Sequence, residues 1–151
     1  MVKKKIWGNI TWYLFHTLSY KLKYDNEENI KNLFKIIKDI CNNLPCVICK
    51  NHANVFLSRV NYNNLKTKEN LINLMFIFHN EVNEKNNTSI FTKNQHDDLY
   101  KKANTSLIIK YFIKIWSFKE GYIGVKQNNF SKELCLKNFK SYISKNRYLF
   151  D

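Results

Sequence analysis

The stretch "ENIKNLFKIIKDICNNLPCVIC", residues 28–49, decides the fold. Its apolar residues recur with the i, i+3, i+4, i+7 spacing of an amphipathic helix, and they are Ile30, Leu33, Phe34, Ile37, Ile40, Cys41 and Leu44. Pro45 ends this pattern, because proline and the residue before it disfavour a continuing helix. A proline at this place also allows a new helix to begin at Cys46. The stretch therefore predicts two consecutive helices, over 28–43 and 46–59, that meet at a C-x-x-C motif.

The remainder of the chain is also predicted to be helical. Thr67 and Thr92 are suitable N-caps for a helix over 68–85 and for a short helix that reaches Ala103. A chain of 151 residues with three glycines and one proline has little of the turn punctuation that strand-rich folds need. The predicted class is all-α, with "EGYIG" (120–124) as a turn and with further helices over 9–23, 105–118 and 131–145.

The net charge of +13 comes almost entirely from lysine, and Arg59 and Arg147 are the two arginines. No block of five like charges occurs, and the tightest run is residues 3–5, so we expect no specific nucleic-acid recognition. The positive field would still attract an anionic cofactor or an acidic partner. We expect no transmembrane helix and no signal peptide, and hence a cytoplasmic protein, because no apolar run is long enough and the N-terminal one is interrupted by polar residues.

Cys46 and Cys49 begin a predicted helix, where the positive end of the helix dipole stabilises a thiolate. In such a pair one sulfur is more exposed than the other, which suits dithiol–disulfide exchange with a partner protein. The alternative is a zinc-stabilised helical binding module, in which Cys46, Cys49 and His52 supply three ligands and His16 or His79 the fourth. The C-x-x-C spacing alone leaves both readings open.

Two further groups of residues favour a flat heterocyclic ligand. Gly8, Trp12 and His16 have the i, i+4, i+8 spacing that places them on one helix face, although Trp12 and His16 are also common core residues. In "FHNEVN", His79 and Asn83 lie one turn apart, and buried polar groups of this kind need partners. Water at an exposed helix end would satisfy them, and the edges of an aromatic ring would do so better.

Three segments, "WGNITWYLFHT" (7–17), "LPCVICKNHANVFL" (44–57) and "FHNEVNEK" (78–85) followed by Phe91, resemble in order and spacing the motifs of the FAD-dependent sulfhydryl oxidases of the Erv/ALR family. The similarity runs from Ile6 to Ala103, and it is most marked with the short forms of large cytoplasmic DNA viruses, of the African swine fever virus and poxvirus types. The resemblance implies a four-helix bundle with a short fifth helix that binds FAD, in an oxidase domain over 1–103, followed by a helical extension over 104–151 of unknown role.

The resemblance also implies an activity. A reduced protein dithiol, such as a thioredoxin-like or C-x-x-C carrier protein, would attack the disulfide at Cys46, and Cys49 would pass the electrons to FAD and then to O2, giving H2O2. The protein would form a homodimer through its first two helices and serve a viral disulfide-forming pathway in the host cytoplasm or virion. The cofactor residues that the resemblance implies are Gly8, Thr11, Trp12, His16 and His52 at the flavin, His79, Asn80, Val82 and Asn83 at the adenine, Lys85 near the phosphates, and Phe91 and Tyr100 as aromatic packing.

The chain departs from the family pattern at several places. Asn9 and Thr88 stand where the family has a cationic residue, so Lys85, Lys93 or Lys101 would have to contact the phosphates. The family's second, shuttle cysteine pair and its structural disulfide are absent. We therefore expect Cys41 and Cys135 to be buried or free thiols, with pairing to each other or across a dimer as the alternative. The apolar segment 105–118 is expected to pack on the core or on a second subunit, and a basic helix at a membrane surface is the alternative.

Overall fold

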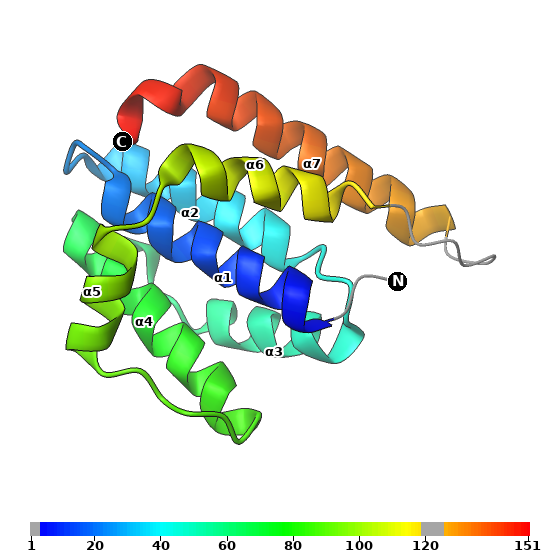
Figure 1. Ribbon diagram of the computed structural model, residues 1–151, viewed down its shortest axis with the longest axis horizontal. Helices are drawn as coiled ribbons and strands as arrows, with labels where there is room; N and C mark the ends of the chain where they lie inside the picture. Colours follow the sequence, from blue (N-terminus) through cyan, green and yellow to red (C-terminus); the bar gives the residue numbers. More distant parts are fainter. Residues whose placement is uncertain (1–3, 119–125) are drawn as a thin grey trace.

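The computed structural model describes residues 4–118 and 126–151, and it describes the side chains of these ranges apart from those of 126–129. Figure 1 shows the arrangement of the helices. The elements in these ranges are α1 (Lys4–Lys21), α2 (Glu27–Cys41), α3 (Val47–Ser58), α4 (Lys68–Lys85), α5 (Lys93–Lys101), α6 (Thr105–Trp116), α7 (Lys126–Asn146) and the short 3₁₀ turns Tyr62–Asn64 and Arg147–Leu149. No strand occurs in the described ranges, so the predicted all-α class is confirmed.

The helix starts follow local capping chemistry. Thr67 accepts a hydrogen bond from the backbone N–H of Asn70, whose side chain bonds back to the backbone of Thr67. Thr92 forms the same reciprocal box with Gln95 at the start of α5. Each cap of this type stabilises a helix by about 1 kcal/mol, and both predicted caps are confirmed.

The helix boundaries differ from the predicted ones mainly at two starts. α1 begins at Lys4 rather than at residue 9, and α7 begins at Lys126 rather than at residue 131. The predicted turn over 120–124 lies outside the described residues. The break at Pro45 is present as predicted, because α2 ends at Cys41 and Cys46 is the N-cap of α3.

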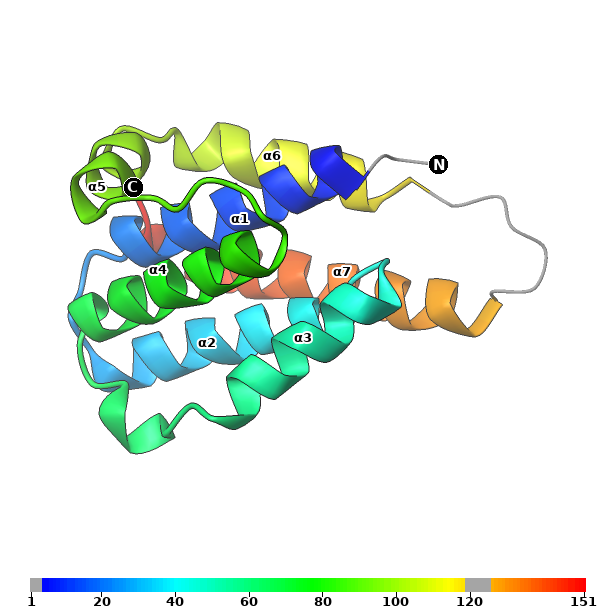
Figure 2. The same ribbon diagram turned by 90° about the horizontal axis from the view of Figure 1, so that it is seen from below.

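Helices α1–α4 form the bundle, and α5 packs against α1 at one end of it (Figure 2). α1 contacts α2, α4 and α5, while α2 contacts α3 and α4. The centre of the bundle is apolar and fully buried, and it includes Leu14, Ile30, Leu33, Phe34, Leu71 and Met75. The bundle core thus consists mainly of the apolar stripes read from the sequence.

The extension after residue 103 packs on this bundle. α6 lies along α1, and α7 packs against α2 and α6 (Figure 1). The Trp116 indole N–H donates a hydrogen bond of 3.1 Å to Thr11 Oγ1, and the Phe112 ring lies 4.9 Å from the ring of Phe139. The predicted packing of segment 105–118 on the core is therefore confirmed. None of the helices in the described part of the chain is long and apolar enough to cross a membrane.

Candidate functional site

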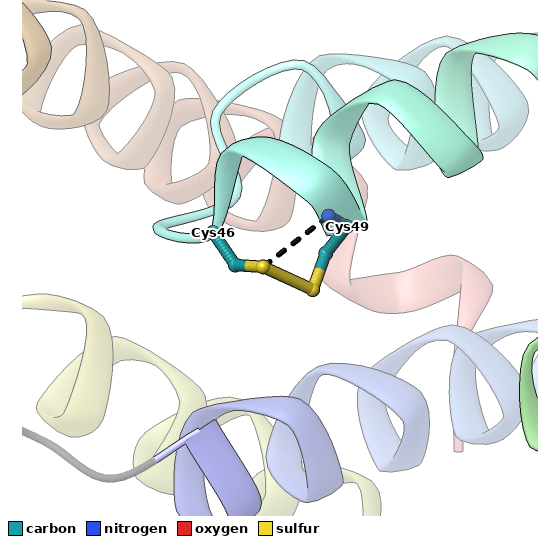
Figure 3. Close-up of a disulfide and its surroundings, with 2 residues drawn as sticks. All are labelled: Cys46 and Cys49. Atoms are coloured by element: carbon teal, nitrogen blue, oxygen red, sulfur yellow. Dashed lines mark hydrogen bonds between the residues drawn. A yellow bond between two sulfur atoms is a disulfide. The ribbon is translucent and has the colours of Figure 1, made fainter. Parts of the chain in front are cut away.

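A disulfide joins Cys46 and Cys49 at the start of α3. Cys46 has extended backbone dihedrals and caps the helix, and its sulfur accepts a hydrogen bond of 3.2 Å from the backbone N–H of Cys49 (Figure 3). This N–H is one of the unpaired donors of the first helical turn. A thiolate on Cys46 would be stabilised by the same N–H and by the positive end of the helix dipole.

The two residues between the cysteines are apolar and exposed. Val47 is 69% exposed and Ile48 is 67% exposed. They give the surface around the disulfide an apolar character.

A cavity of about 370 Å³ lies between α1, α3 and α4. Cys49 lines it, whereas Cys46 does not. Most of the residues predicted to contact a heterocycle also line it, namely Gly8, Thr11, Trp12, His52, His79, Val82 and Asn83. The structure therefore brings together one sulfur of the disulfide and residues that come from three separate segments of the sequence.

One wall of the cavity is flat and aromatic. The rings of Trp12 and His79 are stacked with centroids 4.1 Å apart and planes 7° from parallel, and Phe78 meets Trp12 edge-on at 5.0 Å. Thr11 also lines the cavity, and its hydroxyl donates to the Trp7 carbonyl at 2.6 Å and accepts from the Trp116 indole N–H at 3.1 Å. Its remaining surface toward the cavity is apolar.

The rim of the cavity is polar and cationic. Asn9 and Thr88, where the family pattern has cations, do lie at the cavity, but the cations that line it are Lys4 and Lys5. The lysines predicted for a phosphate contact lie elsewhere. The Nζ of Lys85 lies 3.6 Å from a carboxylate oxygen of Glu81. The Nζ of Lys93 lies 3.4 Å from a carboxylate oxygen of Asp97 and 3.7 Å from one of Glu69. Lys101 does not line the cavity either.

His16 lies behind the wall, in a row of buried hydrogen-bonding groups. Its Nε2 is 2.8 Å from Nδ1 of His79, and its Nδ1 is 2.9 Å from Nε2 of His96. His96 Nδ1 is in turn 2.9 Å from the hydroxyl of Tyr20, which also hydrogen-bonds to Asp97. Sequence reasoning missed His96, Tyr20 and Asp97.

The three imidazoles of this row are neutral. Burial is the main cause that lowers the pKa of His79 and the pKa of His96, each to about 4. Burial, together with the neighbouring rings of His96 and His79, holds the pKa of His16 well below its usual value. Each neutral ring carries one N–H donor and one bare nitrogen acceptor, so the row has a defined donor and acceptor at each step.

Three other predicted residues support the wall from outside the cavity. The side-chain amide of Asn80 donates to the Phe91 carbonyl at 3.0 Å and accepts from the Phe91 N–H at 2.9 Å, which ties the segment after α4 back to that helix. The Phe91 ring lies 5.3 Å from His79. Tyr100 is 2% exposed, with its ring 4.4 Å from that of His16.

Cys41 and Cys135 are free, buried thiols, as expected. Burial is the main cause that raises the pKa of both thiols, that of Cys135 to about 12. A thiol with a raised pKa holds little of the reactive thiolate near neutral pH. The reactive sulfur chemistry of the described residues is therefore concentrated at Cys46 and Cys49.

The zinc hypothesis is not supported. The part of the chain that the structure describes holds no group of three or more His, Cys, Asp and Glu side chains placed to bind a metal ion. The sulfurs of Cys46 and Cys49 are bonded to each other, and a zinc site would need both as separate thiolates.

The cavity instead fits a planar heterocycle that carries phosphate. The stacked Trp12–His79 wall offers a flat face for a ring, and Cys49 lies in the same cavity. Gly8 lines the same cavity, and a Cβ placed there would meet no atom within 4 Å and would extend into free space. Lys4 and Lys5 at the rim supply positive charge for an anionic group.

Comparison with known proteins agrees with this chemistry. Residues 9–101 match the model of the Erv1 / Alr family. An FAD-linked sulfhydryl oxidase of African swine fever virus is 30% identical over 118 residues, which cover 74% of this chain and 96% of the viral protein. A probable FAD-linked sulfhydryl oxidase of fowlpox virus is 30% identical over 74 residues, or 49% of this chain and 71% of that protein. No solved structure matches the chain.

Proposed function

The chain belongs to the Erv1 / Alr family, and we propose that it performs the FAD-dependent thiol oxidation of that family at the Cys46–Cys49 disulfide. It is an oxidoreductase that acts on sulfur groups and takes FAD as its cofactor. The observation that carries our assignment is the position of Cys49, one half of a disulfide, in the same cavity as the stacked Trp12–His79 wall.

FAD bound in this cavity would supply an acceptor for the electron pair of two thiols and a route for that pair to O2. We assign Gly8, Trp12 and His52 to the planar rings, together with His79, Val82 and Asn83 from α4. His16, Asn80, Phe91 and Tyr100 support this wall from behind. Lys4 and Lys5 replace Lys85 in our proposal as the cations nearest the phosphates, because they line the cavity and Lys85 does not.

The protein's own part in the reaction is thiol–disulfide exchange. A substrate thiolate attacks Sγ of Cys46, the Cys46–Cys49 bond breaks, and Cys49 leaves as a thiolate. A second substrate thiolate then attacks the substrate sulfur of this mixed disulfide and releases Cys46 as a thiolate, which leaves an oxidised substrate and a reduced enzyme pair. The Cys49 N–H that points at Cys46 Sγ stabilises the second leaving group.

We propose that the substrate is a protein dithiol and that O2 is the final acceptor. The overall reaction then balances as two thiols and O2 giving one disulfide and H2O2. The exposed Val47 and Ile48 beside the disulfide favour a polypeptide substrate, since an apolar segment of a partner can cover them.

We also propose the homodimer that the family resemblance implies, with α1 and α2 at its interface. Within one chain α6 lies along α1 and α7 packs against α2, so such an interface would have to use the parts of α1 and α2 that these helices leave uncovered. Light scattering decides between a particle of 18.2 kDa and one of twice that mass.

The oxidase assignment is tested by the visible spectrum and oxygen uptake of the purified protein. We expect a yellow protein whose flavin band bleaches on addition of dithiothreitol without air and returns with air. Cys49→Ser should stay yellow and lose dithiol-dependent oxygen uptake, whereas Cys135→Ser, which alters a buried thiol away from the cavity, should retain it. Undiminished oxygen uptake by Cys49→Ser would exclude this disulfide as the redox centre.

A further inference from the structure

Five polar side chains connect the wall of the cofactor cavity with the surface of the protein. They come from three helices: His79 from α4, His16 and Tyr20 from α1, and His96 and Asp97 from α5. Successive members are in hydrogen-bond contact. The distances from His79 to His16, from His16 to His96 and from His96 to Tyr20 are between 2.8 and 2.9 Å. His16 and His96 have no exposed surface, so these contacts do not compete with bulk water.

The outer end of this row sets the direction of every hydrogen bond in it. A carboxylate can only accept, so the Tyr20 hydroxyl donates its single proton to Asp97. The same hydroxyl must then accept from Nδ1–H of His96. The ionised state of Asp97 is favoured by the Tyr20 hydrogen bond and by Lys93, which lies 3.4 Å away, and the pKa of Asp97 is lowered accordingly.

The direction is passed along the row because each neutral imidazole has one donor. With Nδ1 of His96 protonated, its Nε2 is bare and accepts from Nδ1–H of His16. Nε2 of His16 is bare in turn and accepts from Nδ1–H of His79. The ring of His79 therefore carries its proton on Nδ1, and its Nε2 has no hydrogen. Within the described part of the chain this Nε2 has no hydrogen-bonding partner, and His79 lines the cavity.

We infer that Asp97, acting through Tyr20, His96 and His16, fixes the tautomer of His79, so that the cavity presents a hydrogen-bond acceptor where His79 meets the cofactor. The group of the ligand that contacts this nitrogen is then an N–H or NH₂ donor. A bare ring nitrogen or carbonyl placed there would set two lone pairs against each other. Tyr20, His96 and Asp97 lie outside the cavity and act as positioning residues, since they set the proton on His79 without touching the ligand.

The inference is tested by ring-nitrogen NMR on the FAD-loaded protein labelled with ¹⁵N-histidine. Two-bond proton–nitrogen spectra separate protonated from bare ring nitrogens, and we expect His79, His16 and His96 all in the Nδ1–H form. Tyr20→Phe keeps the ring but removes the hydroxyl, and Asp97→Asn replaces a pure acceptor by an amide that can donate or accept. Both variants should convert His79 into a mixture of tautomers.

A neighbouring carboxylate and the redox cysteine provide the controls. Asp98→Asn alters an exposed acid on the same helix and should leave the His79 spectrum unchanged. Cys49→Ser should also leave the His79 spectrum unchanged, because the tautomer of His79 does not depend on whether the protein is an oxidase. Only the part of the inference that concerns the cofactor rests on the proposed function. We expect FAD affinity, measured by flavin fluorescence, to fall several-fold in Tyr20→Phe and to stay constant in Asp98→Asn. The inference would be overturned by an Nε2–H tautomer of His79 in the wild type. It would also be overturned if both Tyr20→Phe and Asp97→Asn gave the wild-type His79 spectrum.

Discussion

The buried imidazoles make the stability of the protein strongly dependent on pH just below neutrality. The native pKa values of His79 and His96 are lowered to about 4 and that of His16 lies well below its usual value, against 6.5 in an unfolded chain. Below pH 6.5 the unfolded chain therefore binds protons that the native protein does not, so stability falls as pH falls and is fully present above about pH 7.5.

The size of the effect follows from proton linkage. For one such histidine the free energy of unfolding decreases by about 1.4 kcal/mol between pH 7.5 and 5.5, and for three by about 4 kcal/mol. Carboxylates contribute little in this interval, because their pKa values in the unfolded chain are about 4. A loss of this size is a large part of the 5–15 kcal/mol that typically stabilises a domain.

Urea unfolding at the two pH values, with FAD in a fixed excess, measures this difference. We expect the free energies of unfolding to differ by about 4 kcal/mol in the wild type and by about 3 kcal/mol in His96→Gln or His79→Gln, which each remove one titrating ring. Cys135→Ser leaves all the histidines in place and lies away from the cavity, so it should keep the wild-type difference. A wild-type difference below about 1 kcal/mol would show that the imidazoles are not buried as neutral rings, and the reasoning would be refuted.

Three further predictions test other parts of the structure. Phe139→Ala removes a ring that is 1% exposed and lies 4.9 Å from Phe112, so it should lower the free energy of unfolding by about 3–5 kcal/mol in urea; a loss below about 1 kcal/mol would mean that α7 does not dock. Ile48→Ser removes exposed apolar surface beside the disulfide, so KM should rise several-fold for a reduced protein substrate and stay constant for dithiothreitol, and equal changes for both would contradict a docking role. Cys41 and Cys135, both buried with raised pKa values, should resist iodoacetamide in the native protein and react in urea, as mass spectrometry can check; rapid native labelling would contradict their burial.

The helical fold could be predicted from the sequence because its causes are local. The stripe of α2 and the threonine caps at Thr67 and Thr92 depend on residues within a few positions of each other, and the structure agrees with them. The apolar pattern predicts a start of α1 at residue 9 instead of Lys4, since Lys4 and Lys5 carry no apolar periodicity. The two cations that line the cavity therefore lie outside the predicted helix.

The site could be predicted only where its residues share a motif. Cys49, Trp12 and His79 each stand in a recognisable segment, and all three line the cavity. His96 stands in a short, mostly polar helix, and its partner His16 is 80 residues away in the chain. Its burial results from the packing of α5 on α1, which no local spacing encodes.

The contact between α6 and α1 has a consequence for how the protein responds to dilution. Both helices belong to one chain, so their association is intramolecular, and tethered segments of this kind meet at effective concentrations on the order of millimolar. The apolar side of α1 that Phe112 and Trp116 help to cover thus stays covered at any protein concentration. A cover made by a second molecule would come off at low concentration, whereas this one is lost only when the chain itself unfolds.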